Sequence, residues 1–415
     1  MGIRNLRRLV GDKRGGIALI TALSAPLLIG GAGMAVDTVN WAYMRRAMQH
    51  QADLGALAGT FALAQQHSVA ETVSASLTTN NNVALTVAPV IESAPTAGPL
   101  AGNARAVRVV LATDVRLPFV GIAMGGPIRI TAEATAQAVS QGQYCVLSLE
   151  NGNVTGITMS GNAVVNLGCG LMTNAPAASA IAAGGSSMIT ASPVSAVGGL
   201  PLSGNYAEGT QLIPYAVPQY DPLSSLPNPA ITSSTNGGNV NPSQTKTLSP
   251  GSYAGMDLKG TVTLRPGVYY IDGGSFSVGS QAQVSGNGVT IVLSSRTASY
   301  NPQSIATINI NGGAMLNITA PSSGPFMGVL IYQDRRALDG NQSNKINGNS
   351  ASKLQGTVYF PGQAIEFTGT TGMNIDCVQL VARRVTFTGN SRISNTCPAG
   401  SGASSFYGTR VKLVA

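Results

Sequence analysis

The sequence predicts a mainly β protein that begins with one long helix. Residues 15–36 form an apolar run without a charge, and residues 37–66 continue it with helical spacing. Residues 68–140 contain runs in which apolar and polar side chains alternate, as they do in half-buried strands. Across residues 144–415, short β-type runs are separated by Gly and Asn. We therefore expect a transmembrane and amphipathic helix, a small α+β unit that completes a membrane-proximal domain over residues 37–140, and a repeat-like β domain.

The apolar run is long enough to cross a bilayer. At 1.5 Å per residue, its 22 residues match a hydrocarbon core of roughly 30 Å. A signal peptide has an apolar core of only about 7–15 residues before its small-residue cleavage site. No A-x-A site closes this run. We expect a retained anchor, with a cleaved signal or a buried core helix as the alternatives.

The charges around the run predict its orientation. Residues 1–14 carry five basic side chains and one acidic side chain, Asp12. Because positive charge favours the cytoplasmic side of a membrane, this basic segment should stay in the cytoplasm. Arg45 and Arg46 follow the span and favour the opposite orientation more weakly. The chain beyond residue 37 is therefore expected to be exported.

The charge balance does not indicate a nucleic-acid partner. The formal net charge is +8, and residues 1–46 contribute +5 of it through 7 basic and 2 acidic residues. The rest of the chain has 17 basic and 14 acidic residues, without a basic stripe interleaved with aromatic residues. Only 10% of the residues are charged, against about 25% in typical soluble domains. Such a composition is typical of exported β-rich surface proteins.

The helix after the span is expected to pack against a partner. An apolar stripe near 3.5-residue spacing consists of Val36, Tyr43, Ala47, Leu54, Leu57 and Phe61. The run ADLGALAG adds small residues that would let another backbone approach closely. The candidate partner-facing residues are Asp37, Tyr43, Arg46, Gln51, Ala52, Asp53, Gly55 and Gly59. Two alternatives stay open: the partner is the protein's own next domain, or it is another membrane protein.

Degenerate repeats predict the architecture of the β domain. The phrase MSGNAVVNLG has relatives in VSGNGVTIVL, INGGAMLNIT, INGNSASKLQG and FTGNSRIS. Gly and Asn suit tight corners, and stacked coils would bury the apolar residues between corners. A parallel β-helix is favoured, and an antiparallel sandwich is the alternative. Residues 174–250 are rich in Pro, Ser and Gly, which predicts a long excursion or partly ordered loop.

Four cysteines are expected to form disulfides in an oxidising compartment. They are Cys145, Cys169, Cys377 and Cys397, and none lies in a C-x-x-C pair. The two histidines, His50 and His67, are far away in the sequence, so a zinc site is not expected. The simplest pairing is Cys145 with Cys169 and Cys377 with Cys397, although four cysteines allow three connectivities.

Catalysis is not expected either. Glycoside hydrolysis needs two carboxyl groups about 5–9.5 Å apart, and Ca²⁺-assisted elimination needs several acidic oxygens. Only eight acidic residues follow residue 150. The best candidates are Asp334, beside Arg335 and Arg336, and Asp272, and we expect both to cap turns and form salt pairs. Asp334 with Asp339 is the one close pair of acids. No histidine follows His67, which argues against a Ser-His-Asp or Cys-His arrangement. We expect no catalytic residue, no cofactor and no metal.

Residues 13–66 resemble the N-terminal region of the TadE/TadG-like family, membrane proteins associated with assembly of the bacterial tight-adherence (Flp) pilus. The resemblance consists of a basic-Gly-Gly-Ile start, Pro in the span, Asp at its exit, an aromatic-x-x-Arg step and a Gln-x-Ala-Asp-x-x-Ala-Leu-Ala-Gly run. These are Arg14 to Ile17, Pro26, Asp37, Tyr43 to Arg46 and Gln51 to Gly59. The phrases SPGSY, RPGVYYIDGG, YQDRR and YFPG resemble the long exported part of TadG-like proteins.

The chain departs from the pattern of type IV pseudopilins, which are cut after a Gly and carry Glu five residues into the mature chain. The fifth residue after Gly16 is Thr21, and the fifth after Gly15 is Ile20. We therefore expect no pilin-type cleavage, and an anchor that remains in the membrane.

The resemblance implies a non-enzymatic envelope protein that acts as a scaffold or subunit in Tad pilus assembly or tight adherence. It implies a single-pass protein of the bacterial inner membrane with its bulk in the periplasm, display at the cell surface being the alternative. The partners would be the membrane, and other Tad pilus-assembly proteins or a second copy through the N-terminal helix. The alternatives are a surface adhesin or minor pilus component, and a β-helix enzyme that acts on polysaccharides.

Overall fold

The structure is a computed structural model, and it describes residues 16–121, 125–340, 343–348, 352–369, 377–389, 392–394 and 406–414. The chain forms two compact units. Unit 1 comprises residues 1–139 and 411–415, and unit 2 comprises residues 140–410. The boundaries fall within strands β3 (Ile128–Ser148) and β26 (Phe406–Leu413). In sequence, unit 2 is therefore inserted into unit 1.

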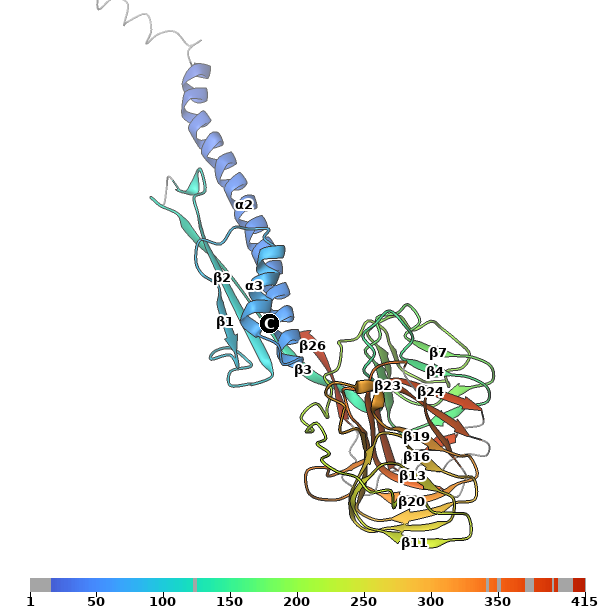
Figure 1. Ribbon diagram of the computed structural model, residues 1–415. Coiled ribbons are helices and arrows are strands. Elements are labelled where there is room, and N and C mark those ends of the chain that lie inside the picture. Colours follow the sequence, from blue (N-terminus) through green and yellow to red (C-terminus); the bar gives the residue numbers. More distant parts are fainter. Residues whose placement is uncertain are drawn as a thin grey trace, which may run out of the picture. The chain divides into compact units, whose positions relative to one another are not determined.

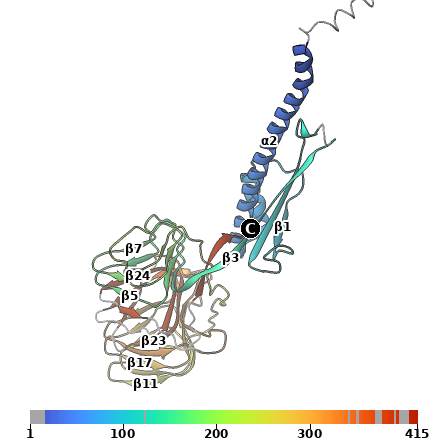
Figure 2. The ribbon, with the colours of Figure 1, turned by 180° about the vertical axis from the view of Figure 1, so that it is seen from behind.

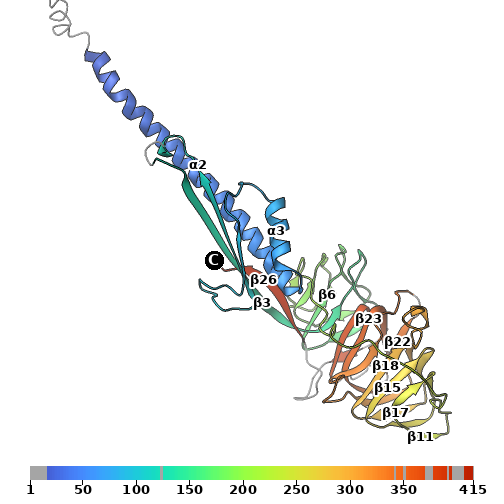
Figure 3. The same ribbon diagram turned by 60° about the vertical axis from the view of Figure 1, so that its left-hand side comes forward.

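Unit 1 contains one long and one short helix. The long helix, α2 (Gly16–Ala64), has 49 residues and includes Pro26. It runs without a break from the apolar run through the amphipathic segment. The short helix, α3 (Val69–Thr79), starts at the N-cap Ser68, whose hydroxyl accepts a hydrogen bond from the backbone N–H of Glu71. It packs beside the C-terminal part of α2 (Figure 3).

A three-stranded antiparallel sheet covers one side of α2. It consists of β1 (Val90–Ser93), β2 (Ala106–Val115) and the first part of β3. Strands β2 and β3 form a long hairpin whose register ends at the pair Val115 and Ile128. The hairpin lies along the helix (Figure 1). Val414 donates its backbone N–H to the carbonyl of Thr135, so the C-terminal end of the described chain also joins this unit.

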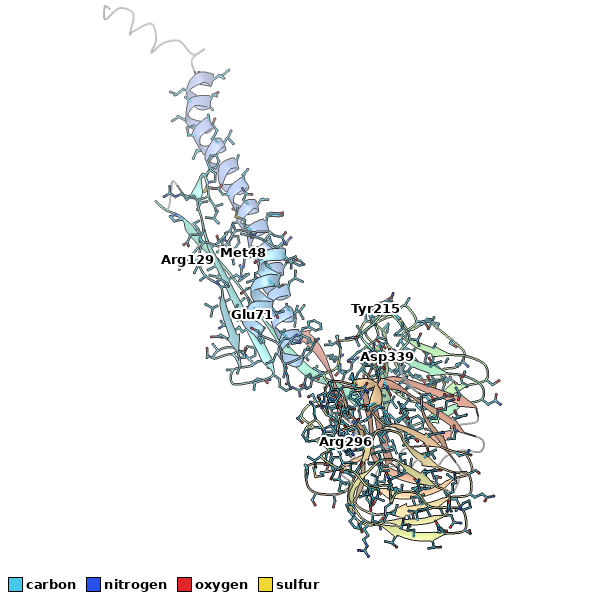
Figure 4. All side chains as sticks on the ribbon, viewed as in Figure 1. Met48, Glu71, Arg129, Tyr215, Arg296 and Asp339 are labelled. Carbon is cyan, nitrogen blue, oxygen red and sulfur yellow. A yellow bond between two sulfur atoms is a disulfide. The ribbon has the colours of Figure 1, made fainter. Side chains whose placement is uncertain are left out.

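The core of unit 1 uses small helix residues against β-branched sheet residues. Met48, Ala52 and Ala56 of α2 are fully buried against the sheet and α3. A Cβ atom added to Gly59 would lie 2.7 Å from Val73 and 2.9 Å from Val107. Because real Cβ contacts are not so close, the missing side chain at this position is what allows helix and sheet to approach. Figure 4 labels Met48 on α2.

Unit 2 is a stack of parallel coils (Figure 2). The strands of successive coils pair with one another in three ladders. The first ladder contains β12 (Gly251–Tyr253), β15 (Gly267–Asp272), β18 (Val289–Ser294), β21 (Val329–Gln333), β23 (Lys353–Gly369), β24 (Cys377–Gly389), β3, β6 (Gly170–Thr173), β9 (Val194–Ala196) and β10 (Leu212–Ile213). The second contains β13 (Met256–Leu258), β16 (Ser275–Val278), β19 (Thr307–Ile310), β22 (Asn344–Gly348), the later parts of β23 and β24, β4 (Ile157–Met159) and β7 (Ile181–Ala183).

The third ladder has two parts. One contains β11 (Thr245–Leu248), β14 (Thr261–Leu264), β17 (Gln283–Gly286), β20 (Met315–Thr319) and the start of β23. The other contains β25 (Arg392–Ser394), β5 (Val164–Asn166) and β8 (Met188–Ile189). A 3₁₀ turn, η2 (Pro302–Ser304), lies in the loop between β18 and β19. Every described pairing within unit 2 is parallel, and the inward side chains form one continuous apolar core.

The coils do not follow one another along the stack in sequence order. Residues 144–213 build coils from the middle of the stack toward one end. Residues 235–394 begin at the other end and return to the middle, where β24 pairs with β23 on one side and with β3 and β4 on the other. The chain thus enters and leaves the solenoid at its middle. The segment 214–234, here called the strap, joins the two ends.

Stacked glycines form one row of corners. Gly161, Gly185 and Gly389 all have positive φ, between 67° and 71°. A Cβ atom on Gly185 would lie 2.9 Å from the carbonyl oxygen of Gly161, and one on Gly161 would lie 3.2 Å from the backbone nitrogen of Gly389. Only glycine combines this backbone conformation with so close an approach of successive coils. Two of the three glycines belong to the repeat phrases found in the sequence.

The structure confirms a mainly β fold with a long N-terminal helix and parallel coils, and it contains the disulfide between Cys145 and Cys169. Cys397 lies outside the described residues, so its pairing with Cys377 stays a prediction. Residues 174–250 differ from the expected excursion. They contribute β7 to β11, with Ile181, Ile189 and Val194 in the core. Coils with strands of only two or three residues leave too short an alternating pattern to be recognised in the sequence.

Candidate functional surfaces

The N-terminal half of α2 presents a continuous apolar surface. Its large apolar residues with more than half of their area exposed are Ile17, Leu19, Ile20, Leu23, Leu27, Leu28, Ile29, Met34, Val36 and Val39. Within the described part of the chain, α2 is the one helix long and apolar enough to cross a membrane. So large an exposed apolar patch marks a contact with a membrane or with another protein. This half of α2 is therefore a candidate single membrane span.

Five of the eight candidate partner residues lie inside unit 1. Asp37, Gln51, Ala52, Gly55 and Gly59 are buried. A Cβ atom on Gly55 would contact Leu77, Val109 and Val73 of the same unit. Of the two alternatives for the small residues, the structure thus shows packing on the protein's own next domain. These small residues are not available to another protein while unit 1 is folded.

The other three candidates are exposed or half-buried. Tyr43 and Arg46 are exposed, and Asp53 is half-buried and accepts a hydrogen bond from Gln49 at 2.9 Å. Tyr43 is 70% exposed and continues an outward apolar face that includes Val36 and Val39. An apolar face beyond the span is therefore open to a partner, but it is not the face that carries the small residues.

Asp37 fastens the tip of the β2–β3 hairpin to α2. Its carboxylate Oδ2 accepts the backbone N–H of Phe119 at 2.7 Å and that of Val120 at 2.6 Å. The other oxygen, Oδ1, is buried without a hydrogen-bond partner among the described residues. A cavity of about 190 Å³ lies beside it, lined by Asp37, Thr38, Trp41, Leu117, Val120 and Ile128. Asp37 is therefore a buried residue that binds within unit 1.

The strap is tied to the solenoid by its backbone and side chains. Asn174 exchanges two hydrogen bonds with the backbone of Gln219, at 2.7 and 2.8 Å. The Gln219 side chain in turn accepts the N–H of Thr409 and donates to its carbonyl, at 2.7 and 3.0 Å. Further along, the Arg335 guanidinium donates to three strap carbonyls, those of Leu223, Ser224 and Leu226. The strap is thus an ordered part of unit 2.

A tyrosine cluster lies under the strap. The rings of Tyr332 and Tyr359 stack with centroids 5.4 Å apart, and both side chains are fully buried. The Tyr359 hydroxyl donates to Asp221 of the strap at 2.5 Å, and the Tyr332 hydroxyl donates to the carbonyl of Pro227 at 3.2 Å. Burial raises the pKa of Tyr359 well above its ordinary value, and the nearby Asp221 charge adds to the effect. Both hydroxyls therefore stay protonated as donors at neutral pH.

An ion cluster in unit 2 surrounds the buried carboxylate of Glu150. Its carboxylate accepts hydrogen bonds from Arg383 at 3.0 Å, from the backbone N–H of Gly152 at 2.7 Å, and from Arg384. Arg384 also contacts Asp339. Burial opposes the ionisation of Glu150, but the hydrogen bonds from Arg383, Gly152 and Arg384 outweigh it and lower the pKa of Glu150. This carboxylate is held ionised, which is the opposite of what a general acid needs at neutral pH.

The two acids singled out in the sequence lie in separate clusters. Asp334 is fully buried and accepts hydrogen bonds from Arg336 and Ser294, at 2.6 and 2.7 Å. Asp339 pairs with Arg384 and Arg383 instead. Asp272 pairs with Arg296, labelled in Figure 4; burial opposes ionisation there, but the Arg296 contacts prevail and the pKa of Asp272 falls. These pairings agree with the expected structural use of the acids.

The outward side of the third ladder is nearly uncharged. Its outward side chains form two columns in register, Thr245, Thr261, Gln283 and Met315 in one, and Thr247, Thr263, Ser285, Asn317 and Lys353 in the other. A groove of about 340 Å³ crosses β14, β17, β20 and the start of β23 on this side. Hydroxyl and amide groups at the regular spacing of a parallel ladder give a surface that can hydrogen bond to a neutral polar ligand.

Sequence reasoning missed three of the residues that organise these surfaces. Glu150 lay just outside the stretch searched for acids, and Gln219 and Asp221 lay in the segment expected to be a loop. Their partners are 45 to 234 residues away in the sequence, so no local pattern marks them. The described residues contain no group of three His, Cys, Asp or Glu side chains that could hold a metal ion.

Comparison with models of protein families, with curated proteins and with solved structures finds no match for this chain.

Proposed function

We propose that this protein is a membrane-anchored, non-enzymatic envelope protein that takes part in assembly of a Tad-type (Flp) pilus or in tight adherence. In this proposal α2 crosses the bacterial inner membrane once, residues 1–14 stay in the cytoplasm, and units 1 and 2 lie in the periplasm. The observation that carries it is α2 itself. Most of the first half of this helix is exposed and apolar, and the other half is built into a folded unit.

Two further observations support a structural role. The acids that could have formed a catalytic pair, Asp334 and Asp339, are each engaged by arginine. The polar side chains of the strap likewise serve the solenoid's own stability. The proposed role in pilus assembly rests on the resemblance of residues 13–66 to the TadE/TadG-like family.

The outward apolar face of α2 is the proposed contact with a second copy or with another pilus-assembly protein. It starts at the end of the span, so a neighbouring membrane helix could continue along it. A Tyr43→Cys variant in native membranes should give a crosslinked product, whereas Tyr300→Cys, at an equally exposed site in unit 2, should not. The mass of the product distinguishes a homodimer from a complex with a different protein. No crosslink at residue 43 would contradict this contact.

Fractionation of the host cell tests the proposal as a whole. A blot of inner-membrane, outer-membrane and sheared-surface fractions, with the intact mass of the chain, should find the full-length protein in the inner membrane. Deletion of the gene should reduce the number of pili, and the wild-type gene should restore it. A protein found only in the cytoplasm, or unchanged piliation after deletion, would contradict the proposal.

A surface adhesin is the second candidate, favoured by the uncharged outward columns and the groove on the third ladder. Under this alternative a processed form would appear in the sheared fraction. The purified full-length protein would bind neutral glycans on an array, and Asn317→Asp in the groove would weaken binding. An array without any bound glycan would count against it.

A further inference from the structure

Residues 117–121 at the end of the β2–β3 hairpin, here called the tip, lie beside the candidate span. The sequence from Leu117 to Ile128 is LPFVGIAMGGPI, which has no charge. It is flanked by Arg116 and Arg129. The tip carries exposed apolar surface, since Phe119 is 40% exposed although it also packs on α2. Such a sequence is unusual for a hairpin tip in water, because turns normally carry polar residues.

The tip contacts α2 within the apolar run. Gly33 is buried, and a Cβ atom at this position would collide with the ring of Phe119. Gly33 lies three residues before Val36, the last residue of the run, which is about 4.5 Å along a helix axis. If α2 crosses the bilayer, the Phe119 ring is therefore held about 4.5 Å below the end of the span. Apolar groups of interfacial segments typically lie about 5–10 Å into the boundary between headgroups and acyl chains.

The backbone of the tip is prepared for a site with little water. Phe119 and Val120 begin a helical turn, in which the N–H of Gly121 bonds to the carbonyl of Leu117 at 2.8 Å. The first N–H groups of such a turn have no partner within it. Asp37 accepts both of them. Away from water, an unpaired backbone group would cost several kcal/mol. A buried carboxylate at the span exit is explained by this role.

The charges at the base of the tip fit the headgroup region. Arg116 and Arg129 are both exposed, and Arg129 forms a two-bond pair with Asp114 on the neighbouring strand, at 2.9 and 3.0 Å. Their positions on either side of the apolar tip resemble the basic residues that flank membrane-spanning segments. Arg116 is left with an exposed guanidinium, which suits a lipid phosphate.

We propose that the hairpin tip is a second membrane contact of this protein. It enters the acyl-headgroup boundary of the leaflet from which α2 emerges, with Phe119 as the inserted side chain and Arg116 at the level of the phosphates. The lipid surface is favoured over a protein partner because the tip is continuous with the exposed face of the span. Unit 1 would then be held at two points, which fixes how α2 rotates about its own axis. The inference rests on the membrane anchoring proposed above.

Tryptophan quenching by brominated lipids tests it, because Trp41 is the chain's single tryptophan. In a Trp41→Phe background, the full-length protein carries one new tryptophan and is reconstituted into vesicles with bromine at shallow acyl positions. Phe119→Trp is the test. Leu28→Trp, in the span, is the positive control. Phe61→Trp, exposed and 25 residues beyond Val36 on α2, is the negative control.

The expected result is strong quenching at residues 28 and 119 and at most weak quenching at residue 61. Quenching at residue 28 without quenching at residue 119 would overturn the hairpin contact and leave the anchor intact. No quenching at residue 28 would overturn the anchor and the contact together. A tip covered by protein would give quenching at residue 28 but not at residue 119, because the partner would shield residue 119 from lipid.

A lipid-dependence experiment uses the native tip. Wild-type protein and the Arg116→Gln variant are compared in vesicles with and without anionic lipid, with proteolysis of the hairpin as the readout. Anionic lipid should slow cleavage after Arg129 in both proteins and should slow it less in the variant. Equal cleavage rates with and without anionic lipid, in both proteins, would contradict a headgroup contact at Arg116.

Discussion

Replacing Glu150 with Gln tests whether the buried ion cluster stabilises unit 2. The change keeps the size of the side chain and removes its charge. Three donors lose a charged acceptor: Arg383, the N–H of Gly152, and Arg384. A hydrogen bond to a charged group contributes about 1.5–3 kcal/mol, and Gln can still accept from one donor. Asp339 remains as a partner for both arginines, so we expect a loss of about 2–4 kcal/mol at neutral pH.

The effect should depend on pH in a definite direction. The pKa of Glu150 is lower in the folded than in the unfolded protein. Its contribution to stability is therefore fully present above the unfolded value of about 4.3 and is lost as the pH falls through the folded value. The difference between wild type and Glu150→Gln should be constant near pH 7. It should shrink below about pH 4.

Thermal unfolding of unit 2, followed by the circular dichroism of its β-structure, measures this difference. For a unit of this size, about 1 kcal/mol corresponds to roughly 2–4 °C, so the midpoint should fall by about 4–16 °C at pH 7. Glu366→Gln is the matched control, because Glu366 forms a partly exposed pair with Lys345, and such pairs contribute about 0–1 kcal/mol. Equal effects of the two changes, or a Glu150 effect that is as large at about pH 3 as at about pH 7, would refute the reasoning.

Three other changes test the packing described above. Tyr359→Phe removes the hydroxyl that binds Asp221 and should speed hydrogen exchange and proteolysis within the strap, whereas unchanged protection would show that the strap is held by other contacts. Gly59→Val should destabilise unit 1 by about 1–3 kcal/mol through overpacking. Gly31→Val, where a Cβ atom meets nothing within 4 Å, should not, and equal effects in denaturant unfolding would contradict the packing. Cys145→Ser opens a loop of 24 residues and should cost about 3 kcal/mol, and adding reductant to the wild type should cost at least as much.

Tyrosine ionisation gives a further pH effect. Burial raises the pKa of Tyr269 to about 12, with a smaller contribution from Tyr253. Because its folded pKa lies above the unfolded value of about 10, the stability that the neutral Tyr269 provides is present below pH 10 and is lost as the pH rises toward 12. An ultraviolet titration should show a late tyrosine step near pH 12. Titration of every tyrosine together near pH 10 would contradict the burial of Tyr269.

The sequence predicted the elements whose patterns are long and local. The uncharged run 15–36, the alternation in residues 106–111 and 128–139, and the Gly-Asn corners all act over neighbouring residues, so they predicted the helix, two strands of the small α+β unit and the parallel coils. The pairing of Cys145 with Cys169 followed from proximity in the sequence. These features depend on local geometry, which a single sequence records well.

What could not be predicted depends on contacts between distant residues. Asn174 and Gln219 are ordinary polar residues until the solenoid brings them together. The face of α2 that packs against the sheet could not be predicted either. A helix with small residues on one face and larger apolar residues on another offers two surfaces for packing. The sheet packs against the face that carries the small residues, where Gly55 and Gly59 allow the closest approach.

The insertion of unit 2 into unit 1 has a consequence for the order of synthesis. Residues 411–414 belong to unit 1, and Val414 bonds to Thr135. A ribosome makes all of residues 140–410 before this segment exists. During that interval, β3 at Thr135 lacks the neighbour that Val414 provides. Unit 1 can therefore be completed only after the entire solenoid has been synthesised, although its first residues are made before those of unit 2.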